Sequence, residues 1–275
     1  MDRLKLIIMQ FRRRSLPEEN IFTALSLLKG SRGIPLFSEN WISNRPINID
    51  DYYHYVEKIG NKIDSDVLAG VQYVDENGVI KSIGLAYING RVIRSCEKIN
   101  PSKAVYERKF LKNGIYIKPV TVKGWKIGCV ACVDIFYPEI SRIHAINDAN
   151  VIYNPASIPL DGLNLWHSVL SARASENIAF SVGVNNTRTA YPDGRITSGH
   201  SIAFNPHGDL ILTSGDQDVA LPIILDDKCF DYVERRWAFK EDLKNKYSKH
   251  YESLVTSLTN KNHSIHTKLP SNDLQ

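Results

Sequence analysis

The chain has 275 residues, of which 43% are hydrophobic and 23% are charged. A chain of this size can close a large apolar core without metal ions or disulfide bonds, and its composition excludes collagen, a coiled coil and a disordered protein. Residues 228–275 hold nine of the 34 basic and six of the 30 acidic residues, so the net charge of +4 belongs mainly to the tail. The nearly neutral body has no basic stripe with aromatic residues among it, so we expect no nucleic-acid partner.

The N-terminal segment lacks the pattern of a signal peptide. Its apolar run, from Leu4 to Phe11, is short, and the basic residues Arg12 to Arg14 follow the run instead of preceding it. No stretch reaches the roughly 18 apolar residues of a membrane span. The sequence therefore predicts a cytoplasmic protein with no membrane partner, whose four cysteines are free thiols.

The first half of the chain alternates strands and helices. Leu4 to Phe11 is typical of a buried strand, and Pro17 begins a helix that ends before Gly30 and Gly33. The elements expected next are a strand at 34–37, a helix at 51–63, a strand at 67–73, and a meander through residue 94. Two turn sequences, Asp75-Glu76-Asn77-Gly78 and Asn89-Gly90, define this meander.

The second half repeats this order. We expect a strand at 126–132, a helix at 138–146, a strand at 150–154, a helix at 164–177, and strands at 178–184, 200–205 and 210–213. Strand and helix alternation that hairpins interrupt predicts α/β layers with mixed sheets, and the matching halves indicate pseudo-symmetry. No linker rich in Pro, Gly or Ser divides the chain, so one domain is expected.

A helix with an apolar stripe is predicted in the tail. From residue 242 onward, apolar residues fall at helical spacing: Leu243, Tyr247, Tyr251, Leu254, Val255 and Leu258. Beyond Asn260 the sequence is polar and is expected to fray. We therefore divide the chain into a body, residues 1–225, and a C-terminal extension, residues 226–275. The helix of the extension either packs on its own body or serves as an assembly element.

Cys129-Val-Ala-Cys132 is a Cys-x-x-Cys pair, a pattern that redox and zinc sites use. A zinc site needs a second close pair, yet Cys96 and Cys229 are isolated in the sequence. A redox pair of the thioredoxin type begins a helix, whereas this pair closes an expected strand. The sequence therefore predicts no metal site and no cofactor.

Cys132 is a better candidate for a nucleophile, because it ends an apolar strand where loops meet at the edge of a sheet. A free thiol with a pKa of about 8.5 is only slightly ionised at neutral pH, so it needs a base or a cation nearby. The alternative is a small buried hydrophobic residue, which is common for cysteine. The choice between them depends on other residues.

Charged residues follow other expected strands. Glu39 comes after the second strand, Lys98 comes after the meander, and Glu107 lies nine residues beyond Lys98. Charged residues at strand ends are usually solvated. If these strands share one rim with Cys132, however, the four side chains form a cluster of carboxylates, ammonium and thiol that suits acyl transfer.

The order Glu39, Lys98, Cys132 resembles the carbon-nitrogen hydrolase (nitrilase) superfamily. That superfamily carries its cysteine in a Gly-x-x-x-Cys-x-Asp-x-x-x-Pro-Glu block, and this chain reads Gly128-Cys-Val-Ala-Cys-Val-Asp-Ile-Phe-Tyr-Pro-Glu139. Downstream segments also match in order, at 154–156, 172–177, 182–185 and 199–201. The resemblance runs from about residue 4 to residue 221. It implies a four-layer α-β-β-α sandwich with two mixed sheets, which pairs with a second copy through helices.

The resemblance also implies a role for each residue of the cluster. Glu39 would be the general base, and Cys132 would attack the substrate to give a thioester that water then hydrolyses. Lys98 and the backbone N–H of Val133 would stabilise the oxyanion, and Glu107 would hold Lys98 in place. The other matched residues are expected to be structural, as ion pairs, caps or core: Cys129, Asp134, Glu139, Arg142, Arg173, Glu176 and His200.

Departures from the family pattern bear on the substrate. Members that act on carboxylate-bearing amides often carry arginine just after the aspartate, where this chain has Ile135 and Phe136. Together with Val133, these residues predict an uncharged pocket wall and a neutral or apolar acyl group, unless another loop supplies a cation. Val133-Asp134 resembles the amidase branch, because nitrilases proper place Trp-Glu after the cysteine.

The predicted function is hydrolysis of the C–N bond of a small non-peptide amide, with water as the second reactant and ammonia or an amine as a product. The expected assembly is a homodimer or a larger even-numbered homo-oligomer. Four alternatives stay open within the same fold: an N-carbamoyl hydrolase, a nitrilase, an amidotransferase-like use of the acyl-enzyme, and a non-catalytic binding protein. A nucleic-acid or acidic-partner module on the basic tail is a fifth.

Overall fold

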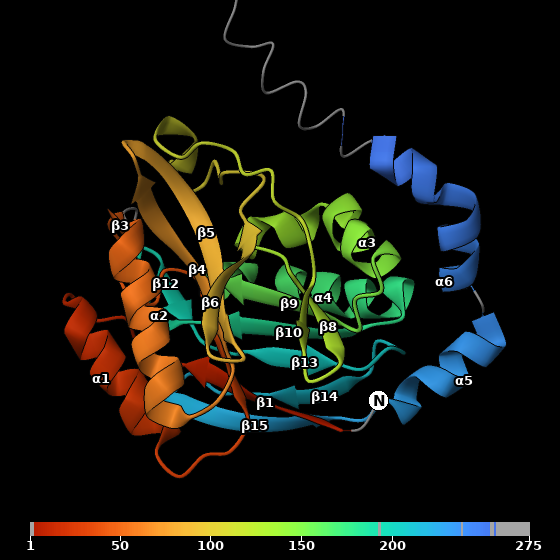
Figure 1. Cartoon of the computed structure of the whole chain (residues 1–275), viewed down its shortest axis with the longest axis horizontal. Coiled ribbons are helices and arrows are strands. Elements are labelled where there is room, and N and C mark those ends of the chain that lie inside the picture. The colour runs from red at the N-terminus through yellow and green to blue at the C-terminus, as the bar shows by residue number, and fades with distance from the viewer. Residues whose placement is uncertain (1–2, 192–193, 238, 254–255, 257–275) are drawn as a thin grey trace, which may run out of the picture.

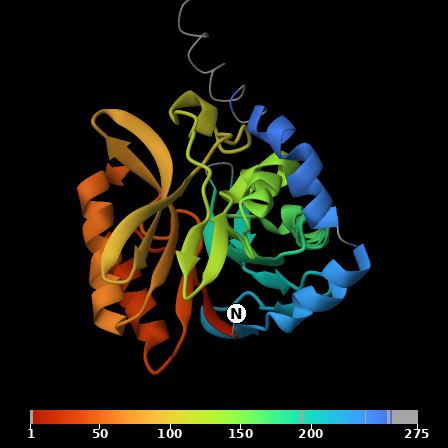
Figure 2. The same ribbon diagram turned by 45° about the vertical axis from the view of Figure 1, so that its right-hand side comes forward.

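The computed structural model describes residues 3–191, 194–237, 239–253 and 256. Two mixed β-sheets face each other in the middle of the molecule (Figures 1 and 2). The first sheet contains, in spatial order, β15 (Val219–Leu225), β1 (Leu4–Gln10), β2 (Ile34–Phe37), β4 (Val67–Glu76), β5 (Val79–Ile88) and β6 (Arg91–Glu97), with β3 (Ile47–Asn48) beside β4. The second contains β14 (Leu210–Thr213), β13 (Ile202–Phe204), β10 (Phe180–Asn185), β9 (Val151–Ala156), β8 (Trp125–Cys129) and β7 (Val120–Val122).

The two sheets share one pattern of strand directions. In the first sheet β1, β2 and β4 run parallel, and in the second β10, β9 and β8 do the same. Antiparallel strands flank these parallel strands on both sides. The repeated order agrees with the pseudo-symmetry expected from the sequence, and it brings the carboxyl ends of β2 and β8 to the same end of the sandwich.

Helices cover the outer face of each sheet. The helices are α1 (Pro17–Leu28) and α2 (Ile49–Ile63) on the first sheet, and α3 (Pro138–Ile146) and α4 (Leu163–Asn177) on the second (Figure 2). Pro17 in the first turn begins α1, and the side chain of Asn48 caps α2 by accepting a hydrogen bond from the N–H of Asp50. The result is the α-β-β-α sandwich that the family resemblance implied.

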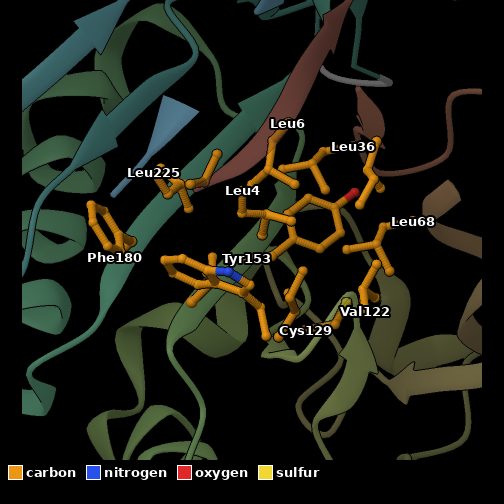
Figure 3. Close-up of a cluster of buried hydrophobic side chains, with 14 of the residues drawn as sticks. Leu4, Leu6, Leu36, Leu68, Val122, Cys129, Tyr153, Phe180 and Leu225 are labelled. Carbon is orange, nitrogen blue, oxygen red and sulfur yellow. The ribbon is translucent and has the colours of Figure 1, made fainter. Parts of the chain in front are cut away.

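Three apolar clusters fill the spaces between the four layers. The outer two lie between each sheet and its helices. The central cluster lies between the sheets, and Figure 3 shows part of it, including Leu6, Leu36, Tyr153 and Phe180. The hydroxyl of Tyr153 donates to the carbonyl of Phe37, so β9 is tied to the end of β2. This bond fixes the two sheets relative to each other just below the point where β2 ends.

The C-terminal extension packs on its own body over its described part. It contains α5 (Lys228–Trp237), α6 (Phe239–Asp242) and a π-helical segment (Leu243–Tyr247). Phe230 is buried, with its ring 5.4 Å from that of Phe180. The ammonium of Lys240 lies 3.5 Å from the carbonyls of Ala149 and Ile178. The first helix of the extension is therefore part of the central core.

The predicted apolar stripe of the tail is only partly described. Leu243 and Tyr251 are half-buried and Tyr247 is exposed, while Leu254, Val255 and Leu258 lie outside the described residues. Within the described ranges, none of the helices combines the length and the hydropathy that crossing a membrane requires.

Candidate active site

A cavity of about 750 Å³ opens at the end of the sandwich where the carboxyl ends of β2, β6 and β8 meet. Glu39 and Lys98 each lie just beyond one of these strands, and both line the cavity together with Cys132. Parallel strands bring their carboxyl ends to one edge of a sheet, which is where α/β proteins place their sites. The structure thus joins residues from both sheets in one cavity.

Lys98 lies between two carboxylates. Its Nζ atom is 2.7 Å from Oε1 of Glu39 and 2.7 Å from Oε1 of Glu107. The exposed fractions of these three side chains are 1%, 4% and 0%, so the array is closed to bulk water. Two carboxylates around one ammonium give the array a net negative charge, which leaves one carboxylate able to accept a proton.

Glu107 is held by two further donors. The hydroxyl of Tyr73 donates to the same oxygen of Glu107 that Lys98 contacts, and the main-chain N–H of Ser102 donates to the other oxygen. With three donors directed at its two oxygens, this carboxylate is fixed and positions Lys98. Tyr73 was not among the candidates from the sequence, because nothing in the spacing of β4 marks it.

Cys132 lies at the start of a short 3₁₀-helix, η2 (Cys132–Phe136), rather than at the end of a strand. The expected strand 126–132 ends at Cys129, and the backbone of Cys132 adopts a left-handed conformation with φ +42°. For a residue other than glycine such a conformation costs about 1–3 kcal/mol, and it is found most often at functional sites. This turn places the thiol close enough to Glu39 that each group shifts the pKa of the other.

Burial controls the ionisation of the thiol and of the two charged groups nearest to it. Burial raises the pKa of the Cys132 thiol well above its ordinary value, the charge of Glu39 raises it further, and Lys98 lowers it in part. Burial lowers the pKa of Lys98, but Glu39 and Glu107 outweigh it and raise that pKa well above the ordinary value. The lysine is therefore a permanent cation, and the thiol keeps its proton until a base removes it.

The pKa of Glu39 shows the same balance of burial against charge. Burial raises it, and the charge of Lys98 lowers it in part. Glu39 therefore binds a proton more tightly than an exposed glutamate does. It lies beside the ammonium of Lys98 and beside the thiol of Cys132, which is protonated. This pairing is what a general base for thiol attack requires.

Asp134 connects the cysteine to the lysine. Its carboxylate accepts hydrogen bonds from the N–H groups of Ile99, at 2.7 Å, and of Asn100, at 2.9 Å. These are the residues directly after Lys98, so η2 and the end of β6 are held in a fixed relation. Burial raises the pKa of Asp134 to about 7, although these bonds act in the opposite direction. Asp134 is structural, as expected.

The cavity wall departs from the sequence prediction at Ile135. Val133 and Phe136 line the cavity, whereas Ile135 is fully buried in the cluster between the second sheet and its helices. A 3₁₀-helix repeats every three residues, so positions 133 and 136 face one side and position 135 faces another. The wall also contains Arg13, from the loop between β1 and α1, so it is not uncharged.

The remaining matched residues lie outside the reacting cluster. Arg173 pairs with Glu176 at 2.8 Å, and Arg142 approaches the same carboxylate at 3.8 Å. Glu139 forms no ion pair among the described residues, and the Nδ1 atom of His200 lies 2.7 Å from the carbonyl of Ser198. Cys129 is buried between the sheets beside Cys96. In the described part of the chain, no three His, Cys, Asp or Glu side chains could hold a metal ion.

Comparisons with known proteins show relatives of similar sequence and a solved structure with the same fold. A Staphylococcus aureus protein, the hydrolase in the agr operon, is 28% identical over 192 residues, which cover 69% of this chain and 72% of that protein. The 2-oxoglutaramate amidase of Bacillus subtilis (strain 168) is 30% identical over 165 residues, which cover 60% of this chain and 63% of that enzyme. The crystal structure of a CN-hydrolase superfamily protein from Xanthomonas campestris has the same fold, with a TM-score of 0.81, 17% identity, and coverage of 88% of this chain and 97% of that one.

The family itself is given by a sequence profile. The profile described as carbon-nitrogen hydrolase matches residues 65–221, which is more than half of the chain. This match includes Lys98, Glu107 and Cys132, and the fold and the relatives point the same way. The chain therefore belongs to the carbon-nitrogen hydrolase family of the nitrilase superfamily.

Proposed function

We propose that the protein hydrolyses a small, linear, non-peptide amide through a thioester on Cys132, and that it releases ammonia or an amine. The observation that carries this proposal is the buried array in which Lys98 lies 2.7 Å from both Glu39 and Glu107, in the same cavity as the Cys132 thiol. Such an array supplies the nucleophile, the base and a fixed cation that amide hydrolysis needs.

The first half of the reaction forms the thioester. Glu39 takes the proton of the Cys132 thiol as the sulfur attacks the carbonyl carbon, and the carbonyl oxygen becomes an oxyanion. Lys98 and the N–H of Val133 stabilise this oxyanion, and such a donor is worth about 2.7–4 kcal/mol. When the tetrahedral intermediate collapses, Glu39 returns the proton to the leaving nitrogen, and the C–N bond breaks.

The second half releases the acid. Glu39 accepts a proton from a water molecule, whose oxygen attacks the thioester carbon. Collapse of the second intermediate expels the sulfur of Cys132, which takes the proton back from Glu39. One base thus serves both halves, which is consistent with a carboxylate whose pKa burial raises and a cation lowers.

The choice of an amide rests on family membership and on the relatives. A relative that is 30% identical is named as an amidase, and the residues after Cys132 resemble the amidase branch. Nitriles and N-carbamoyl compounds react through the same cysteine in this superfamily, so they are the nearest competing substrates.

The experiment is ammonia release from a panel of short linear amides, the corresponding nitriles, and N-carbamoyl amino acids. We expect turnover of amides to exceed that of the other two classes, and to vanish in Cys132→Ala. Preferred turnover of nitriles or carbamoyl compounds would replace the amide assignment, and ammonia release by Cys132→Ala would refute the thioester route. Binding of amides by the wild type without turnover would indicate a non-catalytic protein.

A further inference from the structure

Arg13 brings a cation to the cavity from a loop that is distant in sequence from the reacting residues. It follows β1 and precedes α1, it is half-buried, and it lines the cavity. Its Nη1 atom donates to the main-chain carbonyl of Asn40 at 2.9 Å. Because Asn40 is the neighbour of Glu39 in the chain, the guanidinium lies one residue away from the general base.

The charge of Arg13 has no carboxylate partner in the described part of the chain. The Lys98 ammonium, in contrast, has two carboxylates, and Arg195 lies 3.9 Å from Asp161. A guanidinium has five N–H donors, and the bond to Asn40 uses one of them. The cavity therefore contains a planar cation with unused donors.

The surroundings of Arg13 disfavour an isolated charge. Burial lowers the pKa of the guanidinium, and the nearby phenols of Tyr73 and Tyr191 and the carboxylate of Glu39 oppose this effect only in part. An arginine stays protonated at neutral pH even so. A partly buried guanidinium that no carboxylate contacts has N–H donors to spare, and a carboxylate that enters the cavity would satisfy them.

We propose that Arg13 binds a carboxylate at the end of the substrate opposite to the amide, so that the substrates are monoamides of short dicarboxylic acids. The inference rests on the proposed amidase function. The guanidinium fork matches a carboxylate in two parallel hydrogen bonds, and Phe136 and Tyr191 line the same cavity and suit the short carbon chain between the two ends. Arg13 is thus a specificity residue, which supplies the cation that positions 135 and 136 lack.

A purely structural role for Arg13 predicts a different pattern of effects. If the side chain only anchors the loop of Glu39 through Asn40, its removal should slow all amides equally. If it binds the substrate carboxylate, its removal should slow only the amides that carry one. The comparison of a charged and a neutral amide of the same shape separates the two.

The experiment compares succinamate and glutaramate with their methyl esters in wild-type protein, Arg13→Gln and Arg12→Gln. Arg12 is the matched control, because it is the exposed neighbour of Arg13 and does not line the cavity. We expect wild type and Arg12→Gln to prefer the carboxylates. Arg13→Gln should lose about 30-fold or more in kcat/KM for the carboxylates, mostly through KM, and little for the esters. Retained activity on the esters also shows that the variant is folded.

Three results would overturn the proposal: equal losses on both kinds of amide, no loss in Arg13→Gln, or a preference of the wild type for the esters. If no amide is turned over, the proposed function is wrong, and the role of Arg13 is then tested separately by measuring the binding of dicarboxylates. Calorimetry with succinate and glutarate on Cys132→Ala should then show binding that Cys132→Ala/Arg13→Gln loses. Equal binding by both variants would contradict a carboxylate site at Arg13.

Discussion

The Nζ atom of Lys98 lies 2.7 Å from Oε1 of Glu39, in a region that solvent hardly reaches. Burial alone would favour a neutral carboxyl group, and the ammonium opposes this by stabilising the charged form. The lysine therefore has two functions in the proposed reaction. It keeps Glu39 ionised before the thiol attacks, and it stabilises the oxyanion that the attack produces.

Replacing Glu39 by glutamine tests the base. The amide keeps the size of the side chain but cannot accept the thiol proton, so kcat should fall by about 10²–10⁴-fold. The measurement is ammonia release under saturating substrate, with Glu57→Gln, an exposed glutamate of α2, as the control that should keep full activity. Unchanged kcat in Glu39→Gln would assign the base to another group.

Replacing Lys98 by methionine tests the charge array. The change leaves the carboxylates of Glu39 and Glu107 buried without a cation, and breaking a buried pair in this way costs about 3–5 kcal/mol of unfolding free energy. Urea unfolding measures this loss. The double variant Lys98→Met/Glu107→Gln should recover part of it, because one of the two carboxylates is then neutral. Equal stability of the single variant and wild type would mean that the array is not ionised as described.

The dependence of kcat/KM on pH reports the free enzyme. Glu39 must be charged to act, so activity should rise with pH as Glu39 loses its proton, and burial places this rise above the ordinary glutamate value of 4.5. Burial keeps the pKa of the Cys132 thiol well above its ordinary value of 9.0, so ionisation of Cys132 should not change kcat/KM below pH 9. Two results would contradict the proposed ionisation states. One is a rise of kcat/KM with pH that lies below pH 4.5, and the other is a change of kcat/KM near pH 8 with the same pH dependence as the alkylation of Cys132.

A homodimer or a larger even-numbered homo-oligomer is proposed from the family resemblance. Lys240 and Lys244 of the extension contact the body of their own chain, at Ala149, Ile178 and Asp148. We therefore expect mass measurement under native conditions to give the same number of subunits before and after removal of residues 240–275. A monomer only in the shortened chain would show that the extension crosses to a partner.

The sequence predicted the α/β layers from local patterns, and its resemblance to a known family indicated which residues lie together at the site. Helix α3 begins at Pro138, as expected from a proline at a helix start, and β2 has the predicted bounds. Strand β15 was missed, because it pairs with β1 more than 200 residues away and contains Pro222, which argues against a strand. Long-range pairing of this kind has no signal within a short window of sequence.

The fine structure of the site was less predictable. The 3₁₀-helix that begins at Cys132 determines that Val133 and Phe136 face the cavity while Ile135 faces the core, and the residue types alone do not contain this information. Tyr73 and Arg13 reach the site from β4 and from the loop after β1, without any motif around them. Only the three-dimensional arrangement brings them to the reacting residues.

The covalent intermediate on Cys132 is the most direct test of the proposed reaction. Intact protein mass should be measured after rapid acid quenching of wild type, Glu39→Gln and Cys132→Ala during turnover of a short amide. The thioester route predicts a mass increase equal to the acyl group in wild type, located on Cys132 by peptide mapping, and no increase in Cys132→Ala or Glu39→Gln. Ammonia release by Cys132→Ala, or an acyl group on a different residue of the wild type, would contradict it.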